Sequence, residues 1–198
     1  MNSGPQDFNE VEFANAISSE NDLNLFNMLD ARINNIRSTS RLIASRQSDN
    51  PEKALPEQLF DSAASFKTHT SQVSMHLGRQ WRDKLFGQLD SLLDAEEWDP
   101  SDVPPSLLSY STLLRALLKI MPERKPGLGA TSDGKLIAAW TEGVNRLTLH
   151  CLPRDQFFWT VTRYFGENVE KAGGTTDLSR LMRVLEPYDP KIWFSRAQ

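Results

Sequence analysis

Two heptad patterns in the first half of the chain constrain its fold more than any other feature. In each pattern apolar residues recur with alternating gaps of three and four, which places them along a single stripe of a helix. The first pattern contains Phe26, Leu29, Ile33, Ile36 and Ile43. The second contains Leu59, Phe66, Val73 and Leu77. We expect these residues to form the seam of an antiparallel helical hairpin, and they are candidate interaction residues.

The limits of the two helices follow from capping residues and prolines. Ser19 is the expected N-cap of the first helix, which should end before Pro51 because the residue preceding a proline is driven out of the α region. Pro56 suits the first turn of the second helix, which we expect to reach about Ala95. Gly78 weakens this helix by up to ~1 kcal/mol, so its continuity there is left open.

The second half of the chain has a different pattern. A proline-rich linker at residues 98–105 separates the arm, residues 1–97, from an expected second domain, residues 98–198. Ser106 is a plausible N-cap for a helix that Pro122 should end. A second expected helix begins at Thr176 or Asp177, and the aromatic tail near Trp193 should pack back on the body because it is too apolar to stay exposed.

Alternating residues between these two helices predict three strands. They cover residues 135–141, 146–152 and 157–165, and their short connections indicate an antiparallel meander. The glycine pairs Gly127/Gly129 and Gly173/Gly174 are expected to form turns. The predicted fold class is therefore α+β: a helical hairpin plus a small three-stranded antiparallel sheet packed with helices.

Composition excludes several classes of protein. The chain has 198 residues, a net charge of −4 and a pI near 5.4, so it has no general basic field for nucleic acid. Its only cysteine, Cys151, permits no internal disulfide and suits a reducing compartment. The first residues lack a signal-peptide pattern, and no run approaches ~18 apolar residues, so we expect a cytoplasmic protein without membrane association.

One block of the sequence resembles a known group. Trp98, the prolines at 100–105, Pro122 with Pro126, the Asp133-Gly134 turn and Trp140 occur in the same order in a loose group of small uncharacterised bacterial proteins. The resemblance covers roughly residues 85–165. It implies a bacterial α+β unit and no particular activity. An antitoxin-like or phage-defence role is an analogy with such proteins and rests on no residue.

The residue types used in catalysis do not assemble into a recognisable site. His69 and His76 lie seven residues apart, whereas two metal ligands on a helix need a spacing of three or four. His150 and Cys151 are neighbours on a predicted strand and should point to opposite faces. The acidic residues Asp94, Glu96, Glu97, Asp99 and Asp102 match no calcium loop. We therefore predict no enzyme, no metal and no cofactor.

Interaction with another macromolecule is the expected class of function, and an undetected enzyme with its site between the arm and the sheet is a third hypothesis. We expect a protein partner or a second copy of the chain, because apolar residues off the seam need further cover. These are Leu23, Leu25, Leu42, Phe60, Met75 and Phe86. The alternative is a nucleic-acid-binding regulator that uses an arginine row on the first helix, Arg32, Arg37, Arg41 and Arg46. Lys135, Arg146 and Arg163 offer a smaller basic surface on the sheet, where the third strand also leaves an aromatic residue exposed or covered by a partner.

Overall fold

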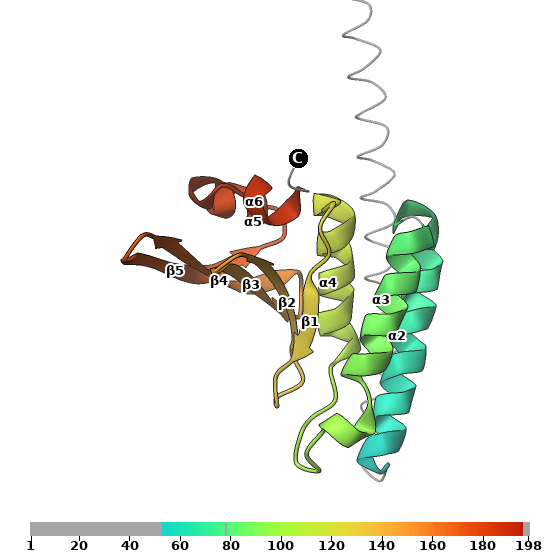
Figure 1. Cartoon of the computed structure of the whole chain (residues 1–198). Coiled ribbons are helices and arrows are strands. Elements are labelled where there is room, and N and C mark those ends of the chain that lie inside the picture. Colours follow the sequence, from blue (N-terminus) through green and yellow to red (C-terminus); the bar gives the residue numbers. More distant parts are fainter. Residues whose placement is uncertain (1–52, 78, 196–198) are drawn as a thin grey trace, which may run out of the picture. The chain divides into compact units, whose positions relative to one another are not determined.

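The computed structural model describes residues 53–77 and 79–195 (Figure 1), and the side chains of residues 74–77 lie outside this description. All described residues belong to one unit of the chain, Ile36–Gln198. The first predicted helix falls outside the described residues. The seam residues Phe26, Leu29, Ile33, Ile36 and Ile43, together with the arginine row Arg32, Arg37, Arg41 and Arg46, therefore stay predictions.

A helical hairpin is present in the described residues, but its partners differ from those predicted. Helix α2 covers Leu55–Leu77 and α3 covers Arg79–Leu92, so the expected long helix is two helices. They lie side by side and antiparallel (Figure 1), since Lys67 of α2 pairs with Asp90 and lies 5.9 Å from the Phe86 ring centroid. The described hairpin is thus α2 with α3.

Helix α4, Leu107–Ile120, is confirmed where the sequence predicts it. The Ser106 hydroxyl accepts the Ser109 N–H at the N-cap, and Met121 ends the helix in a left-handed conformation. The α2 seam residues Leu59, Phe66 and Val73 are buried. Phe66 stacks on Tyr110 of α4, with ring centroids 4.2 Å apart. In the described residues the second stripe therefore packs on α4, and a short helix, η1 (Ala95–Glu97), follows α3.

The described residues form one antiparallel sheet of five strands, where the sequence predicts three. The strands are β1 (Gly127–Ala130), β2 (Leu136–Glu142), β3 (Asn145–Leu152), β4 (Gln156–Phe165) and β5 (Asn168–Asp177), in that order across the sheet. The three predicted strands are β2, β3 and β4. The expectation of turns at the two glycine pairs is wrong, because these glycines lie in the edge strands β1 and β5.

The close approach of β5 to β4 explains why a glycine occupies position 173. A Cβ at Gly173 would lie 2.9 Å from the Trp159 carbonyl oxygen, so only glycine lets β5 approach β4 there. The strand then continues to Asp177, where the sequence predicted the start of the last helix. That helix is α5, and it is shorter than expected, covering Leu181–Leu185. Because β5 extends to Asp177, the residues predicted to cap the last helix lie in the strand. The helix therefore begins later than predicted.

Helices cover one side of the sheet. Helix α4, α5, the short helix η2 (Glu186–Tyr188) and α6 (Lys191–Phe194) contact the side on which alternate strand residues are buried. Trp193 and Phe194 are buried, and the Phe194 ring meets the Trp140 ring edge to face at 5.1 Å. Arg124 ties this tail to β2, donating hydrogen bonds to the carbonyls of Ile192 and Thr141. The aromatic tail packs on the body, as its composition indicates.

Candidate functional site

The side chains suited to nucleophilic chemistry are held apart. His150 lies on the uncovered side of the sheet, whereas Cys151 is fully buried on the covered side. Burial raises the pKa of the Cys151 thiol well above its ordinary value, so the thiolate is disfavoured. His69 is buried in α2, its Nδ1 lying 3.1 Å from the Ser65 carbonyl oxygen. These geometries provide no nucleophile paired with a base among these residues.

Within residues 53–77 and 79–195 no group of three or more His, Cys, Asp or Glu side chains is placed to hold a metal ion. None of the helices described there is long and apolar enough to cross a membrane.

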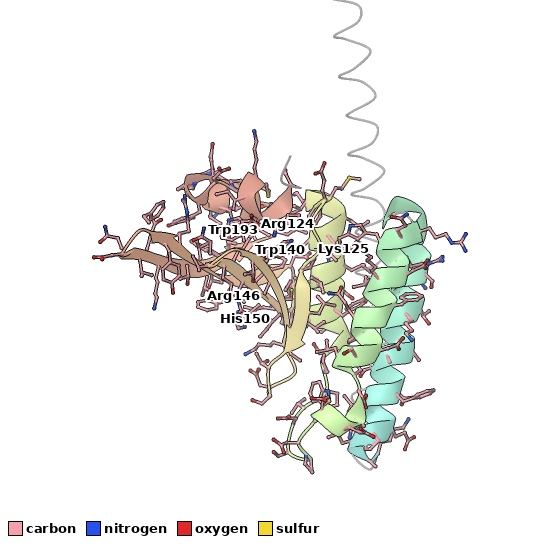
Figure 2. The ribbon with its side chains drawn as sticks, in the orientation of Figure 1. Arg124, Lys125, Trp140, Arg146, His150 and Trp193 are labelled. Carbon is pink, nitrogen blue, oxygen red and sulfur yellow. The ribbon has the colours of Figure 1, made fainter. Side chains whose placement is uncertain are left out.

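The uncovered side of the sheet carries exposed aromatic and charged side chains. Figure 2 shows Arg146 and His150 on this side and Trp140 and Trp193 on the other. Strand register and alternation define the side that we call the open face, whose residues include Ile137, Ala139, Thr141, Arg146, Thr148, His150, Phe158, Thr160, Thr162, Tyr164, Val169, Lys171, Gly173 and Thr175. No described helix packs on this side. The open face is thus a threonine-rich surface that also carries aromatic and cationic side chains.

An aromatic and apolar row crosses one end of the open face. Ile137, His150, Phe158 and Thr175 are register partners on four successive strands. The Phe158 side chain is 41% exposed, and its ring meets the His150 ring edge to face at 5.6 Å. Burial lowers the pKa of His150, and the charge of Lys135 lowers it further, so the ring is neutral near pH 7. The row therefore presents two neutral rings to solvent.

A cationic row crosses the other end of the open face. Arg146, Thr162 and Lys171 are register partners on β3, β4 and β5. Arg146 and Lys171 are two strands apart, which is about 10 Å. Both are exposed, and neither has a carboxylate partner in the described part of the chain. Carboxylates and phosphates are the groups that two such cations bind most strongly.

The open face only partly matches the basic surface expected on the sheet. Arg146 lies on it, and Lys135 lies at its rim, paired with Asp133. Arg163 lies on the opposite side, 4.0 Å from Glu170 and 4.7 Å from the Phe165 ring. The sequence analysis missed Lys171 because it did not predict β5. The alternation of Phe158, Thr160 and Thr162 was the available signal for this face.

Those predicted seam residues that the structure describes belong to the hydrophobic core. Leu59, Phe66 and Val73 are buried in the core of residues 53–195, and the side chain of Leu77 lies outside the described residues. Their role in binding a partner stays a prediction.

Comparisons with known proteins add no assignment to this site. No protein-family model matches the chain, and neither a curated protein nor a solved structure does so.

Proposed function

We propose that this protein is a non-enzymatic protein–protein interaction module that binds its partner on the open face. The observation that carries the proposal is the combination of an exposed Phe158 with the unpaired cations Arg146 and Lys171 on one side of the sheet. Aromatic residues and arginine are enriched where binding energy concentrates in protein interfaces. The partner should therefore present an apolar side chain flanked by carboxylates.

A solvated sheet face is the simplest competing explanation. Antiparallel sheets commonly expose one polar side to water, and the threonines of the open face fit that description. Phe158 and Ile137 fit it less well, because they place apolar surface next to the half-exposed His150 ring. The proposal therefore depends on these residues and not on the threonines.

Single-stranded nucleic acid is a second candidate ligand for the same face. Bases stack on exposed aromatic side chains of sheets while cations contact the phosphates. Phe158 with Arg146 and Lys171 provides a minimal version of this arrangement. The net charge of −4 favours a protein.

Photo-crosslinking in the native cell tests the proposal. A photoreactive residue at the exposed position Thr175, next to Phe158 in register, should trap a protein partner. The double substitution R146E/K171E and the single substitution F158A should each reduce the crosslinked product by about tenfold or more. The matched control is Phe60→Ala on α2, which removes an even more exposed phenylalanine away from the sheet.

Two outcomes would reject a protein partner at this face. One is a crosslinked product that F158A and R146E/K171E leave unchanged. The other is tight binding of the purified chain to single-stranded oligonucleotides with an affinity that falls steeply with salt, which would establish the nucleic-acid alternative. Light scattering on the full chain, with and without R146E/K171E, then distinguishes a second copy of the chain from a different protein.

A further inference from the structure

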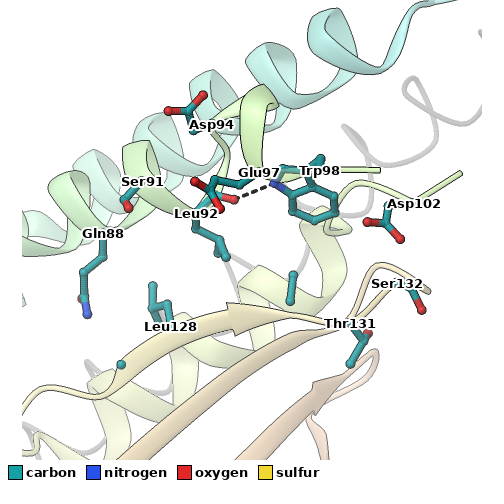
Figure 3. A pocket seen from close by; sticks show the side chains of 12 residues that line it. Gln88, Ser91, Leu92, Asp94, Glu97, Trp98, Asp102, Leu128, Thr131 and Ser132 are labelled. Atoms are coloured by element: carbon teal, nitrogen blue, oxygen red, sulfur yellow. Dashed lines mark hydrogen bonds between the residues drawn. The ribbon is translucent and has the colours of Figure 1, made fainter. Parts of the chain in front are cut away.

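A groove of about 740 Å³ runs along the outer edge of β1 (Figure 3). Strand β1 is at one end of the sheet, so only one of its edges is hydrogen-bonded to another strand. The groove lies on the other edge, between β1, α3, η1 and the linker that follows. It is separate from the open face, whose residues do not line it.

In the described residues, backbone hydrogen-bonding groups on the outer edge of β1 have no neighbouring strand to bond. The Thr131 N–H donates to the Lys135 carbonyl at 2.9 Å, so by antiparallel alternation Gly129 and Gly127 also bond toward β2. The N–H and C=O groups of Leu128 and Ala130 must then point outward, and both residues line the groove. The described residues provide no partner for these groups. An extended chain placed there would complete a sixth strand.

The groove is closed at both ends, which sets the length of such a chain. At one end Gln88 donates its amide N–H to the Pro126 carbonyl at 2.8 Å. At the other end the Val103 N–H donates to the Ser132 carbonyl at 3.0 Å, and Val103 forms an isolated bridge with Asp133. The open stretch between them is about five residues, or roughly 17 Å. At Ser132 and Asp133, directly after the open stretch, the same edge of the chain already bonds the backbone of Val103.

The charge of the lining selects the occupant. Asp94, Glu97 and Asp102 line the groove, and none of the other described residues that line it is a Lys, Arg or His. None of the three carboxylates forms an ion pair in the described part of the chain. Trp98 lies beside Glu97 and Asp102 (Figure 3), and its indole N–H is bonded to the Leu92 carbonyl at 2.8 Å. A fixed tryptophan ring next to carboxylates favours a cationic side chain.

We propose that this groove binds an extended segment of a partner protein that carries Lys or Arg and adds to β1 as a sixth strand. The backbone of Leu128 and Ala130 supplies the hydrogen bonds, and the carboxylates with Trp98 supply the preference for a cation. Nucleic acid is excluded from this site because three carboxylates would repel its phosphates. The inference goes beyond the proposed function, since it concerns a second surface and a partner of opposite charge.

Binding of a defined probe to the full chain tests both parts of the proposal. The probe is a labelled Val-Lys-Val-Lys-Val peptide, compared with the same peptide bearing Glu for Lys and with one in which the amides that face β1 are N-methylated. We expect the lysine peptide to bind at least about tenfold more tightly than either control. The substitution Ala130→Pro should weaken binding by about tenfold, because it removes the outward N–H and leaves the pairing with β2 intact.

Side-chain variants separate the charge preference from the backbone pairing. E97Q/D102N should weaken the lysine peptide several-fold and leave the glutamate peptide unchanged or slightly improved. Glu96→Gln is the matched control, because Glu96 is exposed near the groove and does not line it. Phe158→Ala should have no effect, which distinguishes this site from the open face.

Amide hydrogen exchange provides the decisive measurement. The Leu128 and Ala130 amides should exchange rapidly in the free protein and become protected when the lysine peptide binds. Protection of both amides in the free full-length chain would mean that the protein fills this edge itself, and it would overturn the proposal. The same conclusion follows if the lysine peptide does not bind at about 1 mM, or if A130P and N-methylation leave its affinity unchanged.

Discussion

The two faces of the sheet differ although the same strands form both. On β4, Phe157 is fully buried under the helices, whereas Phe158 is 41% exposed on the open face. The two residues are adjacent and chemically identical, and only strand alternation separates their environments. Residue type alone therefore does not decide which side chains of this sheet are buried. Position in the alternation places one phenylalanine in the core and the other on the open face.

Polar groups also differ between the two faces. On the covered face the Ser109 hydroxyl of α4 donates to the Cys151 carbonyl at 2.6 Å and accepts the Leu136 N–H at 2.8 Å. The Thr112 hydroxyl bonds the Leu152 carbonyl at 2.8 Å. These bonds join α4 to β2 and β3. The hydroxyls of the open face make no comparable bridge in the described residues, so they are free to meet a partner.

The largest expected contrast comes from the paired substitutions Phe157→Ala and Phe158→Ala. The first removes a fully buried ring and should lower the free energy of unfolding by about 3–5 kcal/mol. The second should lower it by less than about 1 kcal/mol and act mainly on partner binding. Urea denaturation of both variants measures the difference. Equal losses would show that the open face is covered in the folded protein.

A buried ion pair gives the next largest effect. Arg115 of α4, only 3% exposed, pairs with Asp155 in the turn between β3 and β4. Asp155→Asn would leave the guanidinium charge buried without its counterion and should cost about 3 kcal/mol. The exposed pair of Lys135 with Asp133 at the rim of the open face is the control, and Asp133→Asn should leave the unfolding midpoint unchanged. A similar loss in both variants would contradict this distinction.

The sequence predicts the covered face better than the edges of the sheet. Strand β3 alternates apolar and polar residues, and Trp140, Leu149 and Val161 mark the buried side of β2, β3 and β4. Strand β5 lacks this pattern because its neighbour supplies the packing: the Trp159 indole lies 3.6 Å from the position of a Cβ on Gly174. Local sequence cannot report a contact made by a different strand.

The groove beside β1 could not be predicted from the sequence for the same reason. The acidic residues Asp94, Glu97 and Asp102 are evident in the sequence, where they resemble a solvated linker. Their position along β1 depends on α3 packing beside that strand, a long-range contact. Glycines at 127 and 129 conceal the strand itself, because an edge strand can be held by its backbone without branched side chains.

Removing one hydroxyl group from each side of the sheet should change stability by an intermediate amount on the covered side and very little on the open face. Ser109→Ala removes the donor to Cys151 and leaves the buried Leu136 N–H without its acceptor, so we expect a loss of about 2 kcal/mol. Thr160→Ala on the open face should change stability by no more than about 0.5 kcal/mol. Thermal unfolding of the two variants measures the contrast. If Thr160→Ala is the more damaging, the open-face threonines are structural.

The smallest expected difference is in the pH dependence of stability, which we compare for the buried His69 and the half-exposed His150. Burial lowers the pKa of His69 in α2 and, together with the charge of Lys135, that of His150 on the open face. Because the folded pKa lies below the unfolded value near 6.5, the unfolded chain takes up the proton first as pH falls. Stability should therefore decline below about pH 6.5, by at most about 1.4 kcal/mol per pH unit for each histidine.

His69→Gln should flatten this decline more than His150→Gln, because His69 is fully buried and His150 is half-exposed. Urea titrations at several pH values between about 7 and 5 measure both slopes. An anionic partner on the open face would favour the charged imidazole, so its binding should raise the pKa of His150 and leave that of His69 unchanged. If the partner shifts both histidines equally, it acts on the whole fold, and the separation of covered and open faces fails.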